Sequence, residues 1–150
     1  MQVKSFLSQH RVACGVEAQS KKRALQILSK LIAEDIPDLD ADEVFMSLTA
    51  RERLGSTGLG KGVAIPHCRL KNCTETVGAL MQLQTGVDYD AIDGNPVDLI
   101  FALMVPEEAH DTHLQVLAAL VERLNKPDYL AALREASTVD DVYQAAISLD

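Results

Sequence analysis

The residues between Gly55 and His67 are the part of this sequence whose types and spacing most directly suggest chemistry. Gly55, Gly58, Gly60 and Gly62 fall within eight residues, in the string LGSTGLGKGVAIPH that ends at His67. Glycine permits positive φ and close approach of the backbone to a ligand or another chain. Such a stretch therefore predicts a tight irregular loop, a cradle of backbone N–H groups for an anion, or both.

A nucleotide-binding P-loop is the first candidate for this stretch, and its details argue against that assignment. Gly55 to Lys61 matches the spacing G-x-x-x-x-G-K, but Gly62 stands where a Ser or Thr should reach the Mg²⁺ ion. A P-loop also follows a strand and opens a helix, whereas this stretch follows a helical pattern and runs into the extended sequence VAIP. Because Gly58, Gly60 and Gly62 do not form G-x-G-x-x-G, dinucleotide binding is disfavoured as well.

His67 is the residue next to this loop that could act as a nucleophile. It directly follows Pro66, whose ring fixes its own backbone dihedral, so the imidazole is expected to be held in one place at the end of a short strand. A neutral histidine carries a nitrogen lone pair and can form covalent intermediates. A histidine beside a strand is, by itself, more often a hydrogen-bonded structural residue. The surrounding sequence decides between the two interpretations.

The string from Leu54 to His67 resembles the active-site signature of the IIA proteins of the bacterial phosphotransferase system, fructose/mannitol class, and most closely their nitrogen-regulatory branch. The resemblance extends over nearly the whole chain. Its other landmarks are SKKRA at 20 to 24, RER at 51 to 53, DGNPVDL at 93 to 99, VP at 105 to 106 and THL at 112 to 114. Separated landmarks in one order argue against a chance match.

The resemblance implies that His67 is a phosphoryl acceptor. Its donor would be the phosphohistidine of a small HPr-like phosphocarrier protein, which enzyme I charges from phosphoenolpyruvate, and neither an organic cofactor nor a metal is implied. Arg51 and His113 would flank His67, with Nε2 as the reacting nitrogen and Nδ1 held by a hydrogen bond that fixes the tautomer. An arginine fork and a second imidazole are physically suited to bind a dianionic phosphoryl group.

Four loop residues are predicted to support the loop or the phosphate: Ser56, Thr57, Gly58 and Gly60. The two hydroxyl residues are equally well explained as turn residues that bond to nearby backbone. Cys68 stands directly after the histidine, where the family usually has Gly, so the backbone there is less free. We interpret Cys68 as a buried inert thiol, although an Arg and a protonated His nearby would make it reactive.

Alternative interpretations of the same residues remain open at this point. Arg51 near a helix end is also explained as a surface cation that the helix dipole favours. A metal-dependent hydrolase would use His67, His110, Asp111 and His113 as ligands, but the spacing H-x-x-H is not the i, i+4 pair that helical zinc sites favour. A non-catalytic interaction module would use the glycine loop only to dock a partner.

Within the family, the signature favours a standalone regulator over a sugar-transport component that passes phosphate to a IIB domain, because no IIB or membrane segment is attached. The expected activity is that of a phosphotransferase, a protein-histidine phosphocarrier. Its expected partners are the HPr-like carrier and, depending on phosphorylation state, potassium-transport proteins or sensor kinases.

Composition narrows the possible partners and the compartment. The 150 residues carry a formal net charge of -8, and only 4% of them are aromatic, with no Trp. An acidic chain with few rings for base stacking is a poor candidate for nucleic-acid binding. The three cysteines form no C-x-x-C pair, and the sequence has neither a signal-peptide run nor an apolar stretch of roughly 20 residues. We therefore expect a cytoplasmic protein without membrane insertion.

Helical patterns lie towards both ends of the chain. Ser20 is predicted to cap a helix through about residue 34, and Asp40 with Glu43 forms a capping box for a helix over 42–53, which Gly55 would end in a left-handed conformation. Three further helices are predicted over 112–124, 127–136 and 139–148, with Thr138 as the cap of the last.

Strand patterns lie in the middle of the chain. Short strands are predicted at 12–16, 61–67 and 76–84, the last two as a hairpin with a wide loop, and the apolar run 97–105 is predicted to be a central strand. Strands between helices predict an α/β domain over residues 1–150, with a mixed β-sheet flanked by helices on both faces. The family resemblance implies the same fold.

Overall fold

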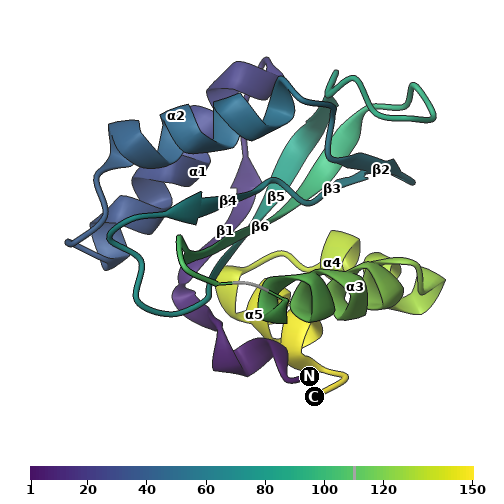
Figure 1. Ribbon diagram of the computed structural model, residues 1–150. Helices are drawn as coiled ribbons and strands as arrows, with labels where there is room; N and C mark the ends of the chain where they lie inside the picture. Colours follow the sequence, from purple (N-terminus) through teal and green to yellow (C-terminus); the bar gives the residue numbers. More distant parts are fainter. Residues whose placement is uncertain (110) are drawn as a thin grey trace.

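The sheet of the computed structural model, which describes residues 1–109 and 111–150, is organised around the buried strand β6 (Figure 1). The strands are β1 (Leu7–Val16), β2 (Gly58–Gly60), β3 (Val63–Ala64), β4 (His67–Leu70), β5 (Val77–Val87) and β6 (Val97–Pro106). β6 pairs antiparallel with β5 on one side and parallel with β3 and β4 on the other. β1 is parallel to β5, and β2 is antiparallel to β3. The sheet is therefore mixed, in the order β1-β5-β6-β3-β2.

Helices cover both faces of this sheet, as predicted (Figure 1). One face carries α1 (Lys21–Asp35) and α2 (Ala41–Glu52), and the other carries α3 (Thr112–Leu124), α4 (Pro127–Glu135) and α5 (Val139–Ile147). A short 3-10 helix, Val3–Ser5, precedes β1. The predicted α/β fold with a mixed sheet between helices is confirmed.

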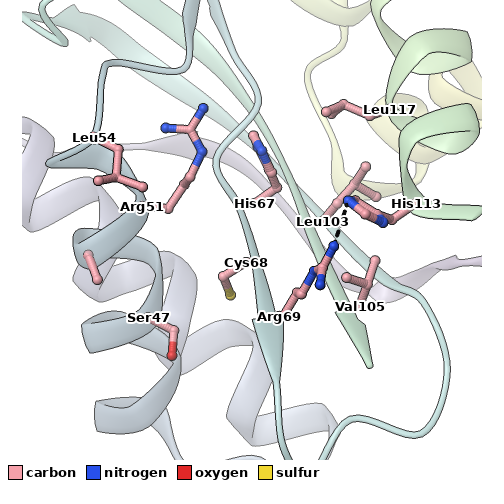
Figure 2. Close-up of a pocket in the computed structure, with 11 residues that line it drawn as sticks. Ser47, Arg51, Leu54, His67, Cys68, Arg69, Leu103, Val105, His113 and Leu117 are labelled. Carbon is pink, nitrogen blue, oxygen red and sulfur yellow. Dashed lines mark hydrogen bonds between the residues drawn. The ribbon is translucent and has the colours of Figure 1, made fainter. Parts of the chain in front are cut away.

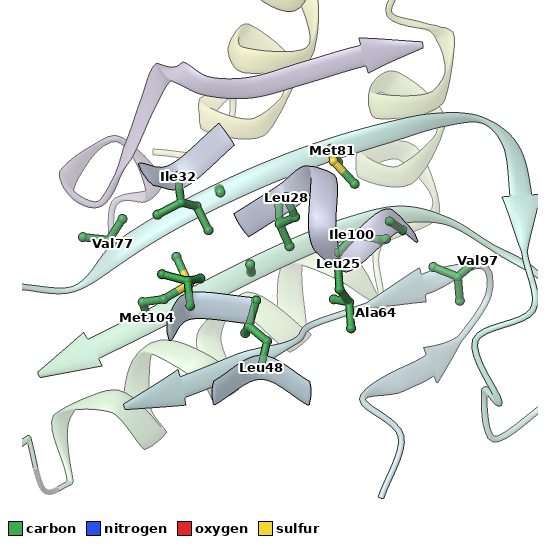
Figure 3. Packing of buried hydrophobic residues seen from close by; sticks show 14 of the residues in the cluster. Leu25, Leu28, Ile32, Leu48, Ala64, Val77, Met81, Val97, Ile100 and Met104 are labelled. Atoms are coloured by element: carbon green, nitrogen blue, oxygen red, sulfur yellow. The ribbon is translucent and has the colours of Figure 1, made fainter. Parts of the chain in front are cut away.

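Alternate residues of β6 belong to alternate layers of the core. Ile100 and Met104 pack in the hydrophobic cluster of α1 and α2, which Figure 3 shows, whereas Leu99 and Phe101 pack in the cluster of the C-terminal helices. The sequence of a strand that is buried on both faces is a nearly continuous run of apolar residues. This explains why the sequence alone identifies 97–105 as a central strand.

The helix boundaries follow the caps expected from the sequence. Ser20, Asp40 and Thr138 each accept a hydrogen bond from the backbone N–H three residues ahead, at 3.0, 3.1 and 3.0 Å. Pro127 occupies the first turn of α4, where its missing N–H costs no helical bond. All five helix predictions agree with the structure to about one residue at each end. Among the described residues, none of these helices has the length and hydropathy needed to cross a membrane.

The prediction of a hairpin between 61–67 and 76–84 is wrong. β5 pairs with β1 and β6, and residues 63–70 form two short strands that both run parallel to β6. Pro66 supplies no N–H to a ladder, so the run is interrupted there and a new strand begins at His67. The strand predicted at 12–16 is also longer, because it begins at Leu7.

Gly55 differs from its predicted role as a left-handed helix terminator. Helix α2 ends at Glu52, and Gly55 has a φ of 150°, far from the value of about 57° of the left-handed conformation. The glycine therefore belongs to the turn that leads from α2 towards β2, rather than to the helix cap.

Candidate functional site

His67 lies at an open pocket of about 450 Å³ between α2 and α3 (Figure 2). The ring is half-buried at the start of β4, and Leu103 of β6 is its register neighbour and also lines the pocket. Arg51 comes from the last turn of α2, and His113 from the first turn of α3. The structure thus brings together the three residues that the sequence analysis placed at the centre of the site.

A hydrogen bond to the chain's own backbone holds the imidazole of His67. Nδ1 lies 2.9 Å from the carbonyl oxygen of Ile65. A carbonyl only accepts, so Nδ1 carries the proton and, in the neutral ring, Nε2 keeps its lone pair. The geometry therefore selects Nε2 as the nucleophilic nitrogen.

The surroundings of His67 favour its neutral form. Burial lowers the pKa of His67 below its ordinary value of 6.5, and the positive charge of Arg51 and the neighbouring His113 lower it further. The hydrogen bond to Ile65 and the charge of Glu52 oppose this shift and are outweighed. At neutral pH the ring is thus available as a nucleophile without a general base.

The polar groups around His67 are mainly cationic. Arg51 donates from Nη1 to the carbonyl oxygen of Gly55 at 2.9 Å. Arg69 of β4 donates from Nη2 to Nε2 of His113 at 3.4 Å (Figure 2). Among the described residues, no Asp or Glu side chain lines this pocket. An incoming dianion would therefore meet guanidinium groups without competing carboxylates.

The hydroxyl groups of the loop bond within the protein. Ser56 donates to the carbonyl oxygen of Tyr89 at 2.8 Å and accepts from the N–H of Gly58 at 3.1 Å. Thr57 is buried, and both its backbone N–H and its hydroxyl donate to the carboxylate of Glu52. These contacts match the turn-residue interpretation, and direct binding of phosphate by Ser56 or Thr57 stays a prediction.

Packing explains two of the predicted loop glycines. A Cβ on Gly58 would lie 2.8 Å from the Cβ of Ala91, so the adjoining loop leaves no room for a side chain there. Gly60 has a φ of 95°, which side-chain-bearing residues rarely adopt. A role of these glycines in binding phosphate stays a prediction.

Cys68 behaves as a packed side chain. It contacts the hydrophobic cluster of α1 and α2, and burial raises the pKa of its thiol to about 12. The thiol is therefore protonated at neutral pH and a poor nucleophile. This agrees with the interpretation of Cys68 as an inert residue in place of the family's usual Gly.

The metal-hydrolase alternative requires His110, which lies outside the described residues. Among the residues that are described, no group of three His, Cys, Asp or Glu side chains is placed to hold a metal ion. His67 and His113 line the same pocket, but Arg69 already contacts His113 at Nε2.

Glu52 is a residue to which the sequence analysis gave no role. It lies beside Arg51 in the last turn of α2, is only 8% exposed, and holds Thr57. A carboxylate near a helix C-terminus is disfavoured by the helix dipole. An acidic residue at such a position therefore indicates that a positive partner compensates its charge. Here the partner is Lys21, whose Nζ lies 2.9 Å from Oε1 of Glu52.

We expect the imidazole of His67 to titrate below pH 6.5, because burial and Arg51 disfavour its charged form. In Arg51→Ala the titration midpoint should rise, since one nearby positive charge is lost. The measurement is a ring-proton NMR titration of wild type and variant, with Arg53→Ala as the control. A midpoint above 6.5 in the wild type would contradict this electrostatic account.

The sequence as a whole matches a known family. The family model for "Phosphoenolpyruvate-dependent sugar phosphotransferase system, EIIA 2" matches residues 5–148. The nitrogen regulatory protein of Pseudomonas aeruginosa is 42% identical over 149 residues, which cover 99% of this chain and 97% of that protein. The nitrogen regulatory protein of Escherichia coli K12 is 42% identical over 145 residues, which cover 96% of this chain and 88% of that protein.

Solved structures give the same result for the fold. The nitrogen regulatory protein IIA-Ntr of Neisseria meningitidis superposes with a TM-score of 0.88 at 37% identity, covering 96% of this chain and 98% of that one. The mannitol IIA of Escherichia coli superposes with a TM-score of 0.76 at 20% identity, and the match covers 93% of this chain and 97% of that one, so the two proteins share the fold. The chain therefore belongs to the EIIA type 2 family of the phosphoenolpyruvate-dependent sugar phosphotransferase system.

Proposed function

We propose that this chain is a phosphocarrier that accepts a phosphoryl group on Nε2 of His67 from the phosphohistidine of an HPr-like protein. Membership of a phosphotransfer family supports the reaction class. The observation that carries the proposal is the hydrogen bond from Nδ1 to Ile65, because it leaves the Nε2 lone pair free in an open, cationic pocket.

The proposed transfer needs few groups. The bond between phosphorus and the donor's ring nitrogen breaks with its electron pair left on the donor, and a new bond to Nε2 of His67 forms. The Nδ1 proton stays on the ring and remains bonded to Ile65. The protein then contributes mainly alignment and charge stabilisation, so neither a general base nor an organic cofactor is required.

Arg51 has opposite effects on a proton and on phosphate at His67. Its charge lowers the pKa of the ring, which keeps the nucleophile neutral. The same charge attracts the dianionic phosphoryl group and can bind its oxygens through charge-assisted hydrogen bonds. On the α3 side of the pocket, the guanidinium of Arg69 donates to His113 and adds a second positive charge.

Incubation with phosphoenolpyruvate, enzyme I and an HPr-like carrier should add one acid-labile phosphate to the wild-type protein. His67→Ala should add none, because the accepting nitrogen is absent. Intact-mass spectrometry measures both, and omission of the carrier is the control. A non-catalytic docking module would keep its mass unchanged, and a stoichiometric zinc in the purified protein would favour a metal hydrolase.

Replacement of Arg51 by Ala should slow transfer by a factor of about 10² to 10³, the usual loss for one donor to a transition state. The rate is followed by quenched-flow mass spectrometry. Arg53→Ala provides a matched control, since Arg53 is an exposed arginine in the same segment that does not line the pocket. Equal rates for the two variants would remove Arg51 from the site.

The proposed cellular role is nitrogen- or potassium-linked regulation from the cytoplasm. It is supported by 42% identity to nitrogen regulatory proteins over nearly their whole length. The fructose-specific EIIABC component of Bacillus subtilis is 28% identical, and the match covers 22% of it. Sugar transport remains the second candidate, because the related fold of mannitol IIA was solved in complex with phosphorylated IIB.

A regulator should bind different partners in its two phosphorylation states, including potassium-transport proteins or sensor kinases. We expect His67→Ala and the mimic His67→Glu to retain different proteins in affinity pull-downs identified by mass spectrometry. The charge placed in the pocket is what the partners would distinguish. Identical partners for both variants and the wild type would contradict regulation by phosphorylation state.

A further inference from the structure

Glu52 closes the loop between α2 and β2. Its carboxylate accepts from the backbone N–H of Thr57 at 3.0 Å and also from the hydroxyl of Thr57. Lys21 of α1 pairs with the same carboxylate at 2.9 Å. These donors compensate a charge that burial and the nearby helix C-terminus both disfavour. A buried carboxylate with three donors is a rigid anchor for the loop.

From Thr57 the hydrogen bonding continues to the ring of His67. The carbonyl oxygen of Thr57 accepts from the N–H of Ile65 at 3.1 Å, and the carbonyl oxygen of Ile65 accepts from Nδ1 of His67 at 2.9 Å. The peptide groups of Ile65 thus bridge the anchored loop and the imidazole. A shift of the loop would move the only acceptor that the described structure gives to Nδ1.

The same loop also orients Arg51. The guanidinium donates to the carbonyl oxygen of Gly55, which lies inside the segment that Glu52 closes. On its other side the loop is held by a hydrogen bond from the hydroxyl of Ser56 to the backbone carbonyl of Tyr89. Arg51 and Glu52 are adjacent in sequence, yet Glu52 pairs with Lys21 and leaves the guanidinium directed to the pocket (Figure 2).

We propose that Glu52 is the positioning residue of the site, which holds Thr57 so that the tautomer of His67 and the orientation of Arg51 are both fixed. This inference rests on the proposed function for its catalytic consequence, but the effect on the ring is independent of any phosphate. Misplacement of reacting groups by about 1 Å costs on the order of 10²-fold in rate. Glu52→Ala should therefore slow transfer about 10- to 10²-fold.

The tautomer of His67 is the readout that a merely stabilising residue would not change. In the full-length wild type, ¹⁵N NMR of the imidazole should show the Nδ1-protonated tautomer. In Glu52→Ala the Nε2-protonated tautomer should appear as well. Glu52→Gln should keep the wild-type tautomer, because the amide can still accept from the N–H of Thr57, while the pKa of His67 falls with the lost negative charge.

Three further variants complete the experiment. Thr57→Val removes the hydroxyl contacts with Glu52 and Tyr89 but keeps the backbone N–H bond to Glu52, so it should shift the tautomer in the same direction as Glu52→Ala but less. Thr57→Ser keeps the hydroxyl and should show the wild-type tautomer. Asp35→Asn breaks the ion pair with Arg11, away from the pocket, and should leave the tautomer unchanged. Should Glu52→Ala fail to fold, as judged by circular dichroism, Thr57→Val decides the result.

An unchanged tautomer and an unchanged rate in folded Glu52→Ala would overturn the role of Glu52. An equal tautomer shift in Asp35→Asn would do the same, because it would reduce the effect to general loosening. If the wild type itself accepts no phosphate, the proposed function fails, and the tautomer comparison still decides whether Glu52 positions the ring.

Discussion

The site depends on one residue, Ile65, whose backbone N–H and carbonyl are not used in the sheet. Ile65 lies between two short strands that both pair with β6, and its N–H and carbonyl bond instead to Thr57 and to the ring of His67. Pro66 has no N–H to continue the ladder, and its carbonyl accepts from Leu103 of β6. The interruption of the strand therefore supplies the acceptor that determines which nitrogen of the imidazole is nucleophilic.

The charge distribution around the pocket is the reverse of that of the whole chain. The protein carries a net charge of -8, yet the described residues that line the pocket include Arg51 and Arg69 and no carboxylate. A carboxylate paired with Arg51 would compete with phosphate and would raise the pKa of His67. Glu52 is adjacent to Arg51 but is engaged by Lys21 and Thr57, so the arginine remains directed to the pocket.

The sequence predicted the parts of the structure that are set by local interactions. The caps Ser20, Asp40 and Thr138 act within one helical turn, and the apolar run of β6 reports burial on both faces directly. The sequence does not predict the pairing of residues 63–70 with β6, because the paired residues, such as Val63 and Leu99, are 36 positions apart and strands this short leave no periodic signal.

The candidate site could be predicted only as far as a shared motif extends. His67, Arg51 and His113 were placed together by resemblance, and the structure brings all three to one pocket. The contacts of Glu52 with Thr57, and of Arg69 with His113, depend on how α2, the loop and α3 meet in space. Side-chain orientation at such junctions has no signature in the spacing of residues along the chain.

Under the proposed function, the placement of the pocket indicates how one phosphate would change which protein binds. The pocket is lined at its edge by Leu54, an apolar side chain that is 84% exposed and can make similar contacts in both states. Phosphorylation of His67 would bring a charge of about -2 to a centre that is otherwise cationic. Because electrostatic complementarity contributes more to specificity than to raw affinity, the two proposed states would differ in specificity without any rearrangement of the fold.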